Sequence, residues 1–284
     1  MRVITAFVRR HPLVAFFVLA YALTWPVIPL VSLSPLLGLP GLFGPALAAV
    51  VTVAVVEGKP GLKNLLGRMV RWRVGAGWYA IALGLPVVLS LATAGVHLVL
   101  GAPASLRFGT LSVFEPILFV LVVGEELGWR GYALSRLLAG NSALTAALIL
   151  GALWGVWHLP TFFVPGAPQY GHPITAFVIL TMAYSVLFTW IYVHAEGSVL
   201  IATLFHGAIN LSQGLILGGL DPGIKYWLLA AVYTVAALVL AVVVGPSLSR
   251  VPRVAGDLGV THESLAFGRK GKVTRRDLDH QRDE

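Results

Sequence analysis

The stretch PILFVLVVGEELGWRGYAL, residues 116–134, places two adjacent acids, Glu125 and Glu126, directly after an apolar run. A charged side chain at the centre of a membrane-spanning helix costs about 2.5–3.5 kcal/mol on insertion scales. Such side chains therefore face a cavity or a charged partner, and they indicate a functional site. The alternative is that the two acids mark a helix end at the lipid headgroups, because the apolar run before them is short.

The chain around this stretch has the composition of a membrane protein. Of its 284 residues, 57% are hydrophobic and 11% are charged, whereas a soluble domain has about 25% charged residues. The long stretches without Asp, Glu, Lys or Arg each exceed the roughly 20 residues that a helix needs to cross a bilayer. They are continuous rather than alternating, which favours helices over the strands of a barrel. These stretches cover residues 11–56, 74–106, 137–195, 197–220 and 226–249.

We therefore expect an all-α, polytopic membrane protein with about eight transmembrane helices and a buried polar site. Proline and glycine clusters, for example at residues 33–41 and 164–173, separate the helices. One transmembrane domain, residues 1–248, precedes a basic, flexible and cytoplasmic tail at residues 249–284. The expected helices lie at about residues 12–32, 41–57, 76–100, 113–139, 142–163, 173–194, 198–218 and 226–246.

The positions of the basic residues predict the orientation. With eight helices both chain ends lie on one side, and that side holds every Lys and Arg except Arg107 and Lys225. Because cytoplasmic loops carry an excess of basic residues, we expect a multi-pass protein of the cell membrane with its N- and C-termini in the cytoplasm. The net charge of +8 is then explained by the basic residues of the cytoplasmic segments, which are attracted to anionic lipid headgroups. No nucleic acid partner is expected. The chain has no cysteine, which excludes disulfides, thiol catalysis and thiolate metal sites.

Helix geometry separates the two acids. Glu126 and Arg130 are four residues apart, so they share a helix face and can form an ion pair. Glu125 points about 100° away from Glu126 and stays available for chemistry. The sequence leaves open which of the two acids acts as a base.

Two further helices carry polar residues in apolar surroundings. His158 lies in WGVWHLP, inside the fifth expected helix, and a hairpin between the fourth and fifth helices brings it within ~3 Å of the height of Glu125. His206 and Asn210, in LFHGAIN, are four residues apart and share a helix face. The alternatives are that His158 is a hydrogen-bonded packing residue and that the other two side chains only join helices by hydrogen bonds.

These three motifs resemble the CPBP family of type II CAAX prenyl proteases and bacteriocin-processing proteins, also called the abortive-infection family. The family pattern consists of an EExxxR motif, a motif with an aromatic residue four positions before a histidine, and an HxxxN-type motif. This chain has EELGWR, WGVWH and HGAIN in that order, within a matching region at about residues 41–218. Trp154 stands where the family commonly has phenylalanine, and we expect this difference to affect packing rather than chemistry.

The resemblance implies an intramembrane endopeptidase, a hydrolase whose site is open to the cytoplasm. The family is described either as metalloproteases or as glutamate-type proteases, in which a glutamate and a histidine activate water without a metal. The expected cofactor is therefore either a zinc ion, bound by His158, His206 and Glu125 or Glu126, or none. Carried over position by position, the catalytic residues are Glu125, Glu126, Arg130, His158, His206 and Asn210.

The same side chains fit hydrolysis of a peptide bond. Glu125 takes a proton from a water molecule that His158 holds, while His206 and Asn210 donate to the oxyanion. The carboxamide suits that role better than a zinc shell, which favours the mechanism without a metal.

The expected partners are the lipid bilayer and a peptide or membrane-protein segment, which reaches the site from the cytoplasmic side. A prenylated peptide is the substrate that the family name implies. Two other classes remain as alternatives: a non-catalytic bacteriocin-immunity or membrane scaffold protein of the same family, and a transporter or proton pathway.

Overall fold

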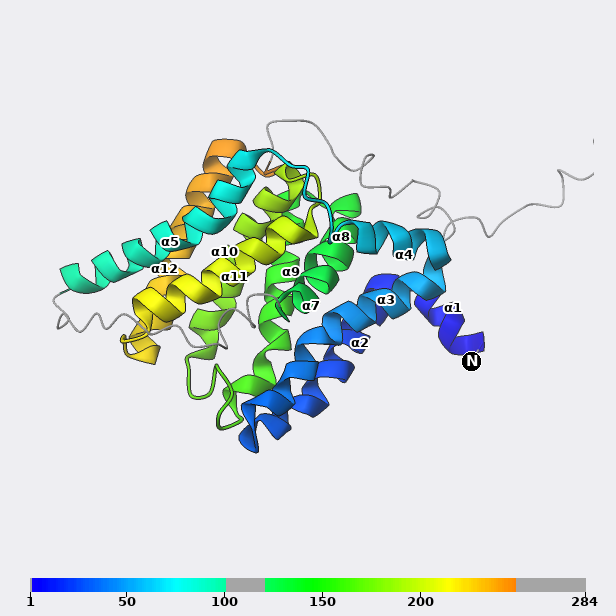
Figure 1. Cartoon of the computed structure of the whole chain (residues 1–284), viewed down its shortest axis with the longest axis horizontal. Coiled ribbons are helices and arrows are strands. Elements are labelled where there is room, and N and C mark those ends of the chain that lie inside the picture. The colour runs from blue at the N-terminus through cyan, green and yellow to red at the C-terminus, as the bar shows by residue number, and fades with distance from the viewer. Residues whose placement is uncertain (1, 101–120, 249–284) are drawn as a thin grey trace, which may run out of the picture.

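The computed structural model describes residues 2–100 and 121–248, and every regular element in these residues is a helix (Figure 1). This confirms the all-α fold. The expected tail at 249–284 and the start of the fourth expected helix, at 113–120, lie outside the described residues. The α-helices are α1 (Arg2–Arg10), α2 (Pro12–Thr24), α3 (Gly44–Val56), α4 (Gly58–Gly67), α5 (Ala76–Val99), α7 (Val123–Glu126), α8 (Ser135–Gly140), α9 (Ala143–Trp157), α10 (Ile174–His194), α11 (Val199–Leu217) and α12 (Pro222–Val244). Three short 3-10 helices, η1 (Trp25–Ser32), η2 (Pro35–Phe43) and η4 (Leu159–Phe162), and one π-helix, η3 (Leu127–Leu134), complete the described elements.

Six helical segments of the described residues are long and apolar enough to cross a membrane. They coincide with six of the expected helices, and the chain is a multi-pass membrane protein. The fourth expected helix is described from residue 121 onward, as α7, η3 and α8, and the fifth is the shorter apolar helix α9. The six segments are Pro12–Ser32, Leu36–Val56, Ala76–Val99, Ile174–His194, Val199–Leu217 and Gly223–Val244.

The end of α9 corrects one expectation from the sequence. The helix stops at Trp157, so His158 follows the helix instead of lying inside it. Pro160 explains the stop, because proline lacks an N–H and its ring clashes with the preceding helical turn. The chain continues as the 3-10 turn η4.

Hydrogen bonds between segments show which helix ends lie together. At one end, Arg9 Nε donates to Val55 O at 3.2 Å, and Val199 N donates to Arg68 O at 3.0 Å. We call this end the basic end; α1, α4 and α8 lie there, on the right of Figure 1. It comprises residues 9–11, 55–75, 131–144, 192–199 and 244–248. The opposite end, the distal end, comprises residues 25–43, 98–100, 157–173 and 215–225.

Close contacts at glycines fix the element that directly follows the candidate acids and the helix that directly precedes His158. A Cβ added at Gly128 would lie 2.5 Å from Pro45 Cβ, so η3 packs directly against the start of α3. A Cβ added at Gly151 would lie 2.6 Å from Met182 Cα, so α9 packs against the backbone of α10. Small residues allow this close approach between helices in membranes.

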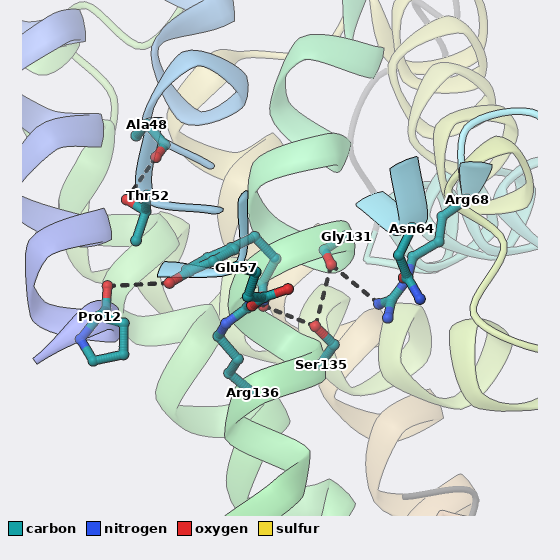
Figure 2. A network of polar contacts seen from close by, with 10 residues as sticks. Pro12, Ala48, Thr52, Glu57, Asn64, Arg68, Gly131, Ser135 and Arg136 are labelled. Atoms are coloured by element: carbon teal, nitrogen blue, oxygen red, sulfur yellow. Dashed lines mark hydrogen bonds and ion pairs between the residues drawn. The ribbon is translucent and has the colours of Figure 1, made fainter. Parts of the chain in front are cut away.

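A polar network at the basic end anchors η3 (Figure 2). Arg68 is buried, and its Nη1 donates to Gly131 O at 3.1 Å and to the Tyr192 hydroxyl at 2.9 Å. Ser135 Oγ also donates to Gly131 O, at 3.1 Å. Arg136 forms an ion pair with Glu57. These contacts join α4 and α10 to the element that begins directly after the two candidate acids.

Candidate active site

The two acids are followed at once by a π-helix. Glu125 and Glu126 are the last residues of α7, and all eight residues of η3 are buried. π-Helical turns are rare in proteins, and those that occur often lie at functional sites. Here the π-helix carries Arg130, the third residue of the first motif.

Glu126 is the centre of a buried polar triad. Arg130 Nη1 donates to Glu126 Oε1 at 2.8 Å, so the predicted pairing of these two side chains is present. His206 Nδ1 lies 2.7 Å from the same oxygen and donates to it when this nitrogen carries the proton. Glu126 and Arg130 are both fully buried. The triad therefore joins the first and third motifs.

Arg130 is also held between aromatic rings. Its guanidinium carbon lies 3.7 Å from the centre of the Phe188 ring and 4.5 Å from that of Trp154. Such cation–π contacts are worth about 2 kcal/mol when desolvated. Among the residues that the structure describes, no hydrogen-bond partner is found for the Nε and Nη2 groups of Arg130. The rings and Glu126 thus hold the guanidinium in one place without satisfying all of its donors.

Glu125 has different surroundings from its neighbour. Trp154 Nε1 donates to Glu125 Oε2 at 3.0 Å. This contact corrects the expectation that Trp154 affects packing alone, because a phenylalanine at this position would have no N–H to donate. Glu125 lines a cavity, and Glu126 does not.

His158 is attached to the same tryptophan. Its Nδ1 lies 2.9 Å from Trp154 O, which makes Nδ1 the protonated nitrogen and leaves Nε2 as an acceptor in the neutral ring. The imidazole also packs edge to face against the rings of Trp157 and Phe177, with centroids 4.7 and 4.9 Å away. His158 is therefore oriented by its neighbours, and it lines the cavity.

The cavity has a volume of about 830 Å³ and a mostly apolar wall. Four candidate residues line it, and they lie on α7, directly after α9, and on α11. Asn210, one turn after His206 on α11, is an exposed residue on this wall. The four residues are Glu125, His158, His206 and Asn210. The predicted convergence of the three motifs on one cavity is thus present, with Glu126 and Arg130 packed behind it.

The cavity residues that the sequence analysis missed include Gln213 and Tyr184. Gln213 donates to the Tyr184 hydroxyl, and both side chains line the cavity. Gln213 lies seven residues after His206 and three after Asn210, on the same helix face. This spacing in the sequence could have predicted that Gln213 shares a site with His206 and Asn210. Nothing in the sequence alone connects Tyr184, on α10, with the motifs.

The arrangement of the donors does not fit a zinc site. Within residues 2–100 and 121–248, no group of three or more His, Cys, Asp or Glu side chains is close enough to hold a metal ion. His206 Nδ1 pairs with Glu126 and Glu125 Oε2 accepts from Trp154, so His206 Nε2 and Glu125 Oε1 are the atoms that these contacts leave for other roles. No step of the chemistry is therefore assigned to a metal.

Six apolar spans in the described residues define a polytopic membrane protein, and its mostly apolar cavity is lined by a few polar side chains from the three motifs. The model of the family described as "Type II CAAX prenyl endopeptidase Rce1-like" matches residues 107–212. "CAAX prenyl protease 2" of Methanococcus maripaludis is 29% identical over 204 residues, which cover 64% of this chain and 72% of the relative. Both findings show that this chain is similar to type II CAAX prenyl endopeptidases, in agreement with the resemblance of its three motifs to the CPBP family, and they support protease activity.

Proposed function

We propose that this protein is a glutamate-type intramembrane endopeptidase, in which Glu125 activates the water that attacks a peptide bond. The observation that carries this assignment is the division between the two acids. Glu125 lines the cavity, whereas Glu126 is fully buried and is engaged by Arg130 and His206. A general base must reach the water from which it takes a proton. Of the two acids, Glu125 is the one in contact with the cavity.

His158 holds the attacking water in this proposal. Its Nδ1 is turned to Trp154 O, so Nε2 can accept a hydrogen bond from water. The water then gives one proton to Glu125, and its oxygen attacks the peptide carbonyl. When the tetrahedral intermediate collapses, the leaving amine takes that proton from Glu125. The products are a carboxylic acid, which keeps the second proton of the water, and an amine; the acid then loses its proton to solvent.

His206 and Asn210 stabilise the oxyanion. They lie one turn apart on α11, and both line the cavity. Asn210 has an amide N–H to donate. Glu126 orients the His206 ring through Nδ1 and can balance a positive charge on it, which leaves an N–H at Nε2 for the oxyanion. Losing one donor of an oxyanion hole typically lowers the rate by about 10²–10³.

The substrate class follows from the wall of the cavity. Apolar residues of η1, η2 and α10, such as Ile28, Leu39 and Phe177, line most of it. A peptide or membrane-protein segment with apolar side chains fits such a wall. We propose no requirement for a prenyl group.

The test compares two Glu→Gln variants of the purified full-length chain in liposomes. A quenched fluorescent peptide with apolar residues reports cleavage. Glu125→Gln keeps the shape of the side chain but removes the base, so we expect the rate to fall by about 10²–10⁴. Glu57→Gln is the matched control, because Glu57 pairs with Arg136 outside the cavity and its loss leaves cleavage intact.

Two results would contradict the proposal. One is cleavage by folded Glu125→Gln at the rate of the unchanged protein. The other is equal loss of activity in both variants, which would indicate a general effect of removing an acid rather than the loss of a base.

A further inference from the structure

The polar side chains of α11 form a stripe along the cavity that continues beyond the candidate site. His206, Asn210 and Gln213 all line the cavity, at positions four and then three residues apart. Such positions lie on one face of a helix. Polar side chains within membrane spans are energetically costly and mark functional sites, and Gln213 lies in the span Val199–Leu217. Of the three residues, Gln213 is the one without a role in the proposed mechanism.

Gln213 is engaged by Tyr184 of the neighbouring helix. Its Nε2 donates to the Tyr184 hydroxyl, and α10 and α11 lie side by side (Figure 1). Tyr184 is 6% exposed, and its ring packs edge to face against the ring of Tyr233, with centroids 4.7 Å apart. The Tyr184 ring also lies 6.4 Å from that of Trp154, which donates to Glu125. The pair of Gln213 and Tyr184 is therefore held in place beside the candidate site.

The hydrogen bond within this pair does not use all of its donors. A carboxamide nitrogen carries two hydrogens, and the contact between the two side chains uses one of them. A phenolic oxygen that accepts a hydrogen bond still has its own hydrogen to donate. The oxygen of a peptide carbonyl has two lone pairs, so it can accept from both side chains. The pair thus has the chemistry of a subsite for a backbone carbonyl.

The spacing along α11 matches the spacing of carbonyls in an extended peptide. At 1.5 Å per residue, Asn210 lies about 6 Å and Gln213 about 10.5 Å along the helix from His206. An oxyanion held midway between His206 and Asn210 is then about 7.5 Å from the level of Gln213. An extended chain advances about 3.3 Å per residue, and carbonyls two residues apart face the same side. Two residues, about 6.6 Å, therefore bring a second carbonyl close to the pair.

We propose that Gln213 and Tyr184 bind the backbone carbonyl of the substrate that lies two residues from the bond to be cleaved. An extended peptide then lies along α11, with the scissile carbonyl at His206 and Asn210 and the second carbonyl at the pair. Because this subsite recognises backbone and not side chains, it determines which peptide bond lies at Glu125. The inference rests on the proposed function, which supplies the scissile carbonyl.

The test combines variants of the pair with changes to the peptide backbone. In the quenched fluorescent peptide, each peptide bond except the scissile one is replaced in turn by an (E)-alkene, which keeps the shape of the bond but removes its carbonyl. Values of kcat/KM are measured in liposomes for the unchanged protein, Gln213→Met, Tyr184→Phe and the variant with both changes. Ser212→Ala is the matched control, because it removes a hydroxyl next to Gln213 that pairs with Ser90, and neither serine lines the cavity.

We expect replacement of the bond two residues from the scissile one to lower kcat/KM of the unchanged protein about tenfold. In the variant with both changes the same replacement should cost less than about twofold, because the donors that the carbonyl would meet are already gone. Ser212→Ala should show the full tenfold loss. Each cost is a ratio of two peptides within one variant, so a lower folded fraction does not change it.

Two results would overturn the inference. One is a set of costs that is the same in the variant with both changes as in the unchanged protein. A hydrogen bond that only joins α10 to α11 predicts this result, because its loss affects all peptides alike. The other is a cost that disappears only at the bond next to the scissile one, whose carbonyl faces away from the pair in an extended peptide.

A second readout separates this inference from the proposed function. Binding of the same peptides to Glu125→Gln, with and without the two changes at Gln213 and Tyr184, is measured by fluorescence anisotropy. A Kd that rises about tenfold on replacement of one bond, but only while the pair is intact, supports the subsite even if the unchanged protein cleaves nothing; the protease assignment would then fail. Cleavage that depends on Glu125, together with equal costs in all variants, would refute the subsite alone.

Discussion

At the scale of single residues, Trp154 connects the parts of the candidate site. Its indole N–H donates to Glu125, its backbone carbonyl lies at hydrogen-bond distance from His158, and its ring contacts Arg130. The His206 ring also packs against it edge to face, with centroids 5.5 Å apart. In the proposed mechanism Trp154 is therefore a positioning residue, since it contacts Glu125 and His158 without being assigned a step of the reaction.

The change Trp154→Phe removes the indole N–H and keeps an aromatic ring. A hydrogen bond to a charged group contributes about 1.5–3 kcal/mol. We therefore expect kcat for peptide cleavage to fall by roughly 10- to 150-fold, with KM little changed. Trp157→Phe is the matched control, because the buried Trp157 Nε1 has no hydrogen-bond partner among the described residues. Equal kcat values for the two variants would show that the contact with Glu125 does not position the base.

The sequence predicted some of these contacts and could not predict others. The pair of Glu126 and Arg130 was predictable because four residues of helix bring the two side chains together. The bond from Trp154 to Glu125 was not, since it joins residues 29 apart through the packing of two helices. The same limit applies to His206, whose pairing with Glu126 depends on where α11 lies beside α7.

At the scale of elements, hydropathy predicted the long spans because lipid requires long, continuous apolar helices. It did not predict the π-helix η3 or the early end of α9. Both features depend on local backbone geometry, which the apolar content of a segment does not reveal. Pro160 indicates that α9 ends nearby, but it does not determine the last residue of the helix. The short elements near the candidate site were therefore the least predictable part of the fold.

The contact between α9 and α10 predicts a difference between two Gly→Ala variants. A Cβ at Gly151 would meet the backbone of Met182 at 2.6 Å, whereas one at Gly84 of α5 meets nothing within 4 Å. We expect Gly151→Ala to lose about 1–3 kcal/mol of stability through overpacking. Gly84→Ala should change stability little or raise it by up to about 1 kcal/mol, since alanine favours helix. Thermal unfolding midpoints in one detergent measure both, and equal midpoints would contradict the close packing.

At the scale of the whole molecule, the candidate site depends on how the helices assemble. The sequence predicted which loops are basic, and hence one orientation. It could not predict that Tyr184 shares a cavity with the three motifs, because the cavity forms between elements that are distant in sequence. Only the assembled bundle places Glu125 and His158 on one cavity wall with Tyr184.

Assembly of the bundle also decides whether a metal takes part. A zinc ion would need Glu125 or Glu126, His158 and His206 to converge as three ligands, and the described residues contain no such group. We therefore expect the purified full-length protein to keep its rate of peptide cleavage after dialysis against a zinc chelator. Elemental analysis of the same sample should find zinc far below one atom per chain. Loss of activity on chelation, followed by recovery on adding zinc alone, would contradict this prediction and place Glu125 among metal ligands instead of assigning it the role of base.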